Sequence, residues 1–101
     1  MDEKDIVIYE NVLEYISLEL SQILKKIPDT YKMKVEEIRL RNGIPLSICF
    51  KGTDYFISRK GGLTKNEYEG VLVNRQDIIK TFQLISNYSV YAFEEEMRNG
   101  F

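Results

Sequence analysis

Hydrophobic and polar residues alternate along residues 35–50, which read V-E-E-I-R-L-R-N-G-I-P-L-S-I-C-F. Alternation with a period of two indicates a half-buried β-strand, and here it occurs on both sides of Asn42-Gly43. These two residues tolerate the positive φ angles of a tight turn, and Pro45 is placed to begin the returning strand. The pattern therefore predicts a β-hairpin with a charged outer face. Its apolar face carries Ile38, Leu40, Leu46, Ile48 and Phe50.

Before this hairpin, apolar residues recur at spacings of three and four, which is typical of an amphipathic helix. Ser17 can divide this stretch in two, because a serine hydroxyl can cap the second helix. Pro28 ends the stretch or opens a short helix over residues 29–33. The stripe predicts a buried face, with a docking face for a partner helix as the alternative. It consists of Val12, Leu13, Ile16, Leu20, Ile23, Leu24 and Ile27.

After the hairpin, the sequence predicts further strands at residues 55–58 and 70–73. Asn74 and Asp77 have the spacing of a capping box, so a helix is expected from Arg75 to about residue 86. Its buried side would carry Ile78, Phe82 and Ile85. Residues 87–89 (N-Y-S) are expected to break this helix, with Ser89 capping a last one.

The resulting fold class is α+β: an antiparallel meander packed by N-terminal and C-terminal helices. The chain has 101 residues, of which 44% are hydrophobic, and this is enough for one domain with one core. The start of the chain is acidic and lacks the basic and apolar segments of a secretory signal. A net charge of −2 argues against non-specific nucleic-acid binding, which usually requires a concentrated basic surface.

The chain contains no histidine and a single cysteine, Cys49. Catalytic pairs with histidine and intrachain disulfides are therefore excluded, and Cys49 is expected to pack as a small apolar residue. Residues 59–65 (R-K-G-G-L-T-K) superficially resemble a phosphate loop, but lysine and a hydroxyl do not directly follow the second glycine. This stretch is better interpreted as a loop between strands. No catalytic residue and no metal site is predicted.

The most suggestive polar residues are Glu37, Arg39 and Arg41, which alternate along one strand. Side chains two residues apart lie on the same face of a strand. Arginines fixed on a sheet present planar donors to carboxylates or phosphates. Two interpretations stay open: a solvated face whose charges pair with one another, and a contact surface for a second domain, a subunit or a nucleotide.

Two blocks carry a resemblance to the stage III sporulation protein AA family of endospore-forming bacteria. They are V-E-E-I-R-L-R-N-G-I-P-L at residues 35–46 and I-S-N-Y-S-V-Y-A-F-E-E-E-M-R-N-G-F at residues 85–101. The family pattern reads E-I-R-L-R-x-G-R-P-L and then S-x-Y-S-x-Y-A-x-E-E-E-L-R-x-G-[FY]. The chain departs from it at Ile44, where arginine is frequent, and at Met97, where leucine is usual. The second change conserves side-chain volume.

The resemblance implies that residues 1–101 form a single N-terminal domain, which in a longer protein precedes a RecA-like motor similar to type II and type IV secretion ATPases. The chain would then be a non-catalytic regulatory or assembly domain without a cofactor, and ATP and Mg would belong to the absent motor. The implied partners are that motor, other subunits of a homo-oligomer such as a hexamer, and membrane proteins of the mother cell–forespore channel, with no nucleic acid. The implied location is cytoplasmic, on the mother-cell side and peripheral to the membrane.

In related ATPases, arginines of the N-terminal domain reach the nucleotide of the assembled hexamer. The resemblance therefore makes Glu37, Arg39, Arg41 and Arg98 candidates for contact with nucleotide or with a neighbouring subunit. The alternative is a self-contained module that binds a peptide or small ligand. That alternative predicts an apolar pocket or an unpaired strand edge.

Overall fold

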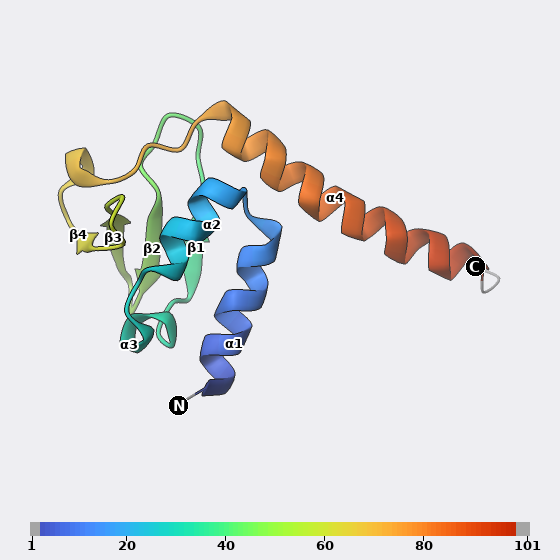
Figure 1. Cartoon of the computed structure of the whole chain (residues 1–101), viewed down its shortest axis with the longest axis horizontal. Helices are drawn as coiled ribbons and strands as arrows, with labels where there is room; N and C mark the ends of the chain where they lie inside the picture. The colour runs from blue at the N-terminus through green and yellow to red at the C-terminus, as the bar shows by residue number, and fades with distance from the viewer. Residues whose placement is uncertain (1–2, 99–101) are drawn as a thin grey trace.

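The computed structural model describes the backbone of residues 3–98 and the side chains of residues 5–87. In this part of the chain, a small sheet lies against a group of helices, and the last helix extends away from both (Figure 1). The helices are α1 (Glu3–Val12), α2 (Leu18–Lys25), α3 (Asp29–Lys32) and α4 (Arg75–Arg98), with 3-10 turns η1 (Leu13–Tyr15) and η2 (Glu67–Glu69). The strands are β1 (Glu37–Arg39), β2 (Ser47–Phe50), β3 (Thr53–Ile57) and β4 (Leu63–Thr64).

The four strands form one antiparallel sheet in the order β1-β2-β3-β4, so each strand pairs with its neighbour in the sequence. Ile48 in β2 lies between Ile38 of β1 and Tyr55 of β3. This register places the apolar residues of the hairpin on one face, as the alternation predicts. The predicted α+β fold with an antiparallel meander is confirmed.

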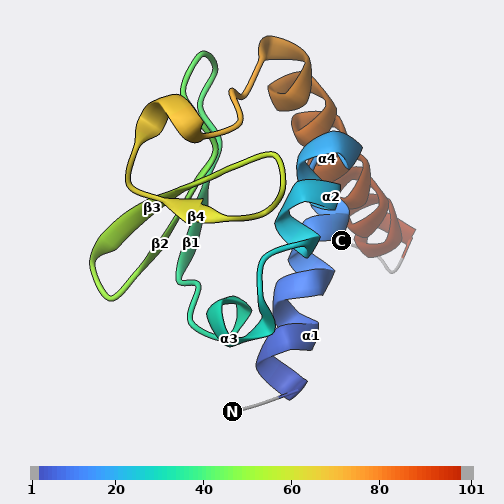
Figure 2. The same cartoon turned by 60° about the vertical axis from the view of Figure 1, so that its left-hand side comes forward.

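The core lies between this apolar face and the N-terminal helices, which form a second layer (Figure 2). Of the predicted N-terminal stripe, every residue except Val12 is buried, whereas Val12 is 47% exposed. The buried hydrophobic residues are Tyr9, Leu13, Ile16, Leu20, Ile23, Leu24, Ile27, Leu46, Ile48, Phe50, Ile57, Val71 and Val73.

Ser17 does divide the N-terminal helices, but its hydroxyl does not cap α2. The hydroxyl instead donates a hydrogen bond to Asp77 Oδ1 at 3.0 Å, and the Ser17 backbone N–H donates to Thr81 Oγ1 at 3.0 Å. Both acceptors belong to α4. The predicted cap is therefore wrong, because a partner distant in the sequence takes the hydroxyl.

The connection between β1 and β2 is longer than the predicted tight turn. Gly43 has a φ of +78°, yet its N–H donates to Val73 O at 2.8 Å across the molecule. Pro45 does not begin the returning strand and forms a bridge with Leu72. The strand predicted over residues 70–73 is reduced to this bridge, since the segment crosses the ends of β2 and β3. There the Leu46 N–H donates to Val71 O at 2.7 Å.

The capping box at the start of α4 is confirmed. The Asp77 N–H donates to Asn74 Oδ1 at 2.9 Å, and the Asn74 N–H donates to Asp77 Oδ2 at 3.0 Å. The predicted break at residues 87–89 is wrong, because α4 continues through it to Arg98. Asparagine and serine cost only a few tenths of a kcal/mol (~0.5) within a helix, so strong cues are needed to end one there.

Helix α4 projects beyond the body of the molecule, as Figure 1 shows. The chain has a radius of gyration of 15.3 Å, whereas a compact chain of this length has about 13 Å. Ile78 is half-buried, but Phe82 is 68% and Ile85 49% exposed, so the predicted burial of these last two residues is wrong. The physical reason is that the helix leaves the core after its second turn.

Candidate interaction site at the edge of the sheet

Arg39 lies on the outer face of the sheet between two carboxylates. Its Nε donates to Glu37 Oε1 at 2.8 Å, and its Nη1 donates to Asp54 Oδ2 at 2.8 Å. The register explains the contact, since Glu37, Cys49 and Asp54 are aligned across three strands. The hydrogen bond that Arg39 donates to Glu37 and the charge of Asp54 raise the pKa of Arg39. For Arg39, the structure therefore shows the first of the two interpretations, a face whose charges pair with one another.

Cys49 lies on the same face between Glu37 and Asp54 and is half-buried. Desolvation is the main cause that raises the pKa of its thiol, and a hydrogen bond with Asp54 adds to the shift. Both effects favour the neutral thiol over the thiolate. This environment is the opposite of the electropositive site that activates a cysteine, although Cys49 lies on the charged face and not in the apolar core.

Arg41 lies beyond the end of β1, in the exposed connection to β2. Within the described side chains, no carboxylate forms an ion pair with it. The structure thus separates the two arginines that the sequence groups together: Arg39 is held by its own sheet, and Arg41 is exposed. Arg98 is the last residue of α4, but its side chain lies outside the described residues.

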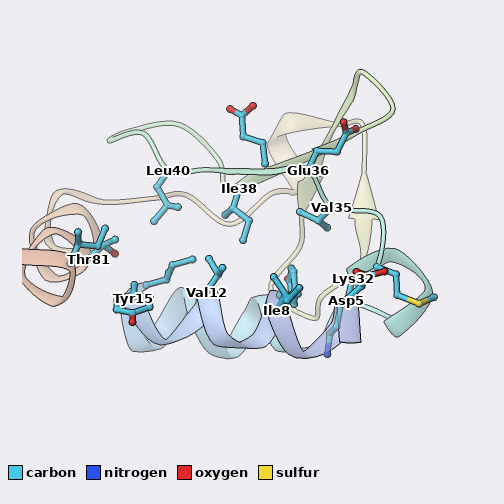
Figure 3. Close-up of a pocket in the computed structure, with 15 residues that line it drawn as sticks. Asp5, Ile8, Val12, Tyr15, Lys32, Val35, Glu36, Ile38, Leu40 and Thr81 are labelled. Atoms are coloured by element: carbon cyan, nitrogen blue, oxygen red, sulfur yellow. The ribbon is translucent and has the colours of Figure 1, made fainter. Parts of the chain in front are cut away.

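A groove of about 460 Å³ runs between α1 and β1 (Figure 3). Ile8 and Val12 project into it from α1, and Val35, Ile38 and Leu40 project from the β1 segment. Thr81 and Ile85 of α4 close one end of the groove. Most of the groove's lining is therefore apolar, and its volume lies in the range of ligand-binding clefts.

The groove follows the free edge of the sheet. β1 is the outermost strand, with β2 as its neighbour in the sheet. Glu37 and Ile38, two successive residues of β1, both line the groove. Successive side chains of a strand point to opposite faces, so a surface that includes both must extend around the strand's edge.

Charged residues also line the groove: Asp5 and Lys32 lie at the end opposite α4, and Glu36 lies on the β1 side with its carboxylate turned away from α1 (Figure 3). Lys32 is only 6% exposed, and its Nζ lies 3.2 Å from Glu10 Oε2 and 3.4 Å from Asp29 Oδ1. These two carboxylates neutralise the lysine. The remaining charge along this part of the groove, from Asp5 and Glu36, is therefore negative.

Sequence reasoning did not find this groove. The apolar stripe predicts burial of Val12, whereas Val12 is 47% exposed and lines the groove. The sequence does contain a sign of this helix face: Ile8 lies four residues before Val12, so the two side chains lie on the same side of α1. Which sheet residues this face opposes could not be read from local spacing.

The described residues contain no group of three or more histidine, cysteine, aspartate or glutamate side chains that could hold a metal ion. No helix in the described part of the chain is long and apolar enough to cross a membrane. The fold and its exposed features thus define a small α+β domain that presents an apolar groove and a charged sheet face.

Comparison with known proteins gives the family. The model of the family described as "Sporulation stage III, protein AA" matches residues 7–101, so the chain belongs to this family. The chain is also similar to stage III sporulation protein AA of Bacillus subtilis (strain 168), with 24% identity over 90 residues. This match covers 89% of the chain but only 25% of the relative. No solved structure gives a significant match to the chain.

Proposed function

We propose that this chain is a non-catalytic assembly and regulatory domain of a larger sporulation protein, in which a secretion-type ATPase motor performs the chemistry. Membership of the family supports a role in sporulation. The chain spans about a quarter of the length of its curated relative, which leaves room for further domains there. In this proposal, ATP and Mg bind to the motor and not to this chain.

The observation that carries the proposal is the exposed apolar surface of α4. Ile79, Phe82, Leu84 and Ile85 are 36–68% exposed on a helix that projects from the body. Apolar side chains gathered on a projecting element typically mark a protein–protein contact. We therefore assign α4 to contact with the motor or with a neighbouring subunit of a homo-oligomer.

Arg41 is a stronger candidate than Arg39 for contact with a nucleotide or a neighbouring subunit. Arg39 already donates to Glu37 and Asp54, so a new partner would have to compete with both carboxylates. Arg41 is exposed and has no such pair among the described side chains. In this proposal, Glu37 acts indirectly, because its carboxylate holds the side chain of Arg39. Arg98 is the last residue of α4, the helix that we assign to contact with the motor or a neighbouring subunit.

The proposal also places the domain on the cytoplasmic, mother-cell side of the forespore membranes, where membrane proteins of the channel would bind the assembled protein. The resemblance in residues 35–46 and 85–101 supports this location. A protein in this position need not cross the membrane itself.

The test measures ATPase activity of the longer protein, with and without residues 1–101, at several protein concentrations. We expect activity to fall on truncation and to depend more steeply on concentration, because the domain helps to build the active oligomer. A motor that is equally active without the domain, at every concentration, would contradict the assembly role.

A matched pair of variants locates the contact on α4. Phe82 and Gln83 are both exposed and adjacent, but only Phe82 is apolar. Phe82→Ser should lower the oligomer fraction in sedimentation velocity and lower ATPase activity, whereas Gln83→Ser should change neither. Equal behaviour of the two variants would remove α4 from the proposal.

A further inference from the structure

We propose that the groove between α1 and β1 binds an extended segment of a partner protein, in which apolar and basic residues alternate, and that this segment joins the sheet as an additional strand beside β1. The inference does not rest on the ATPase-related function proposed above. It concerns the groove and the edge of β1, which share Ile85 with the α4 surface assigned above, and this chain alone suffices to test it.

The edge of the sheet provides the backbone partner. β1 has β2 on one side only, so its other side can accept a new strand. The groove includes both Glu37 and Ile38 of β1, which point to opposite faces, and therefore reaches this side. Recognition of an extended peptide at a sheet edge combines main-chain hydrogen bonds with pockets for alternate side chains.

The apolar part of the groove provides those pockets. Ile8 and Val12 of α1 are 55% and 47% exposed, and they face Ile38 and Leu40 across the groove. The turn of α1 between these residues spans about 6 Å, which matches the spacing of about 6.6 Å between side chains on one face of a strand. Two successive apolar side chains of an added strand would therefore contact Ile8 and Val12.

The acidic side chains around the groove favour basic residues at the positions of the added strand that do not face Ile8 and Val12. Asp5 at one end of the groove and Glu36 on its β1 side are acidic, and Lys32 near Asp5 is already neutralised by Glu10 and Asp29. On the outer face of the sheet, Arg39 is shared by Glu37 and Asp54, so this cluster has a net negative charge. Lysine or arginine side chains on that face of an added strand would meet a complementary surface.

The test uses a fluorescein-labelled nine-residue peptide of alternating valine and lysine, measured by fluorescence anisotropy. We expect saturable binding that weakens as salt is raised. A peptide with glutamate in place of lysine should bind at least about tenfold more weakly, because it repels the acidic border. A peptide methylated at alternate backbone nitrogens should lose binding, because it cannot pair with β1.

A matched pair of chain variants controls for non-specific attraction. Ile8→Gln changes a residue that lines the groove, and Val7→Gln changes its neighbour on α1, which does not line it. The two residues are 55% and 53% exposed, so both variants should fold normally. Ile8→Gln should weaken peptide binding about tenfold, and Val7→Gln should leave it unchanged.

The inference would be overturned by no binding of the valine–lysine peptide, by equal binding of its methylated form, or by equal effects of Ile8→Gln and Val7→Gln. Sedimentation equilibrium tests the competing occupant, a second copy of this chain. If the chain forms a dimer that Ile8→Gln alone dissociates, the groove is an interface between copies and not a site for a partner peptide.

Discussion

The Ser17 hydroxyl donates a hydrogen bond to Asp77 Oδ1 at 3.0 Å, although the two residues lie 60 positions apart in the sequence. Ser17 is 1% and Asp77 5% exposed, so water cannot replace either partner. Asp77 also accepts the Asn74 N–H, and Thr81 accepts the Ser17 N–H. This buried cluster fixes the first turns of α4 to the junction between η1 and α2, and thereby sets the direction in which the helix projects.

Asp77→Ala should lower the free energy of unfolding by about 1–3 kcal/mol, because it leaves the buried Ser17 hydroxyl without an acceptor and removes half of the capping box. Urea denaturation followed by circular dichroism measures the change. Ser17→Ala and the double variant complete a cycle, and we expect the two effects to be less than additive. Gln76→Ala, at an exposed neighbour, is the control and should change stability little.

Gly61→Ala should destabilise the chain more than Gly52→Ala. Both glycines have positive φ angles, +89° and +74°, which cost an alanine about 1 kcal/mol each. At Gly61 an added Cβ would also lie 2.5 Å from the Cβ of Lys26, whereas at Gly52 it would meet nothing within 4 Å. Thermal unfolding compares the two, and similar melting temperatures would show that the contact with Lys26 relaxes at no cost.

Ile48→Ala should cost about 2–5 kcal/mol, because Ile48 is fully buried and its removal leaves a cavity in the core. Ile38→Ala, at its direct partner in β1, should cost less, since Ile38 borders the groove and is only partly buried. Guanidinium denaturation measures both. Equal losses would indicate that the groove side of β1 is packed as tightly as the core.

Arg39→Ala and Arg41→Ala should both leave the melting temperature close to that of the unmodified chain, since ion pairs on exposed surfaces add little stability. In the longer protein, we expect Arg41→Ala to reduce ATPase activity more than Arg39→Ala, because Arg39 is already bound to Glu37 and Asp54. The measurement is the steady-state ATPase rate of each purified variant. A larger loss for Arg39→Ala would reverse the assignment.

Cys49 should react slowly with iodoacetamide at neutral pH, because burial and the hydrogen bond with Asp54 raise the pKa of its thiol. A raised pKa means that the reactive thiolate appears only at higher pH than in a free cysteine. The rate of alkylation of Cys49 should therefore rise at a higher pH than the rate for N-acetylcysteine. Asp54→Asn should shift the profile towards lower pH, and an unchanged profile would show that desolvation acts alone.

Local spacing in the sequence was sufficient to determine which side chains share a face. The alternation of Ile38 with Arg39 predicted the inner and outer faces of β1, and Asn74 with Asp77 predicted the cap of α4. These features depend on neighbours within about four residues, for which strand and helix periods are fixed by backbone geometry. The α+β class followed from them.

The tertiary structure decided which faces meet. Asp54 became the partner of Arg39 only through the register of three strands, and Asp77 took the Ser17 hydroxyl that was expected to cap α2. The same holds for α4, whose apolar residues were predicted to be buried but are exposed because the helix leaves the body. A periodic pattern specifies an apolar face, but the contacts that cover it depend on packing between distant segments. The groove along β1 exists for the same reason.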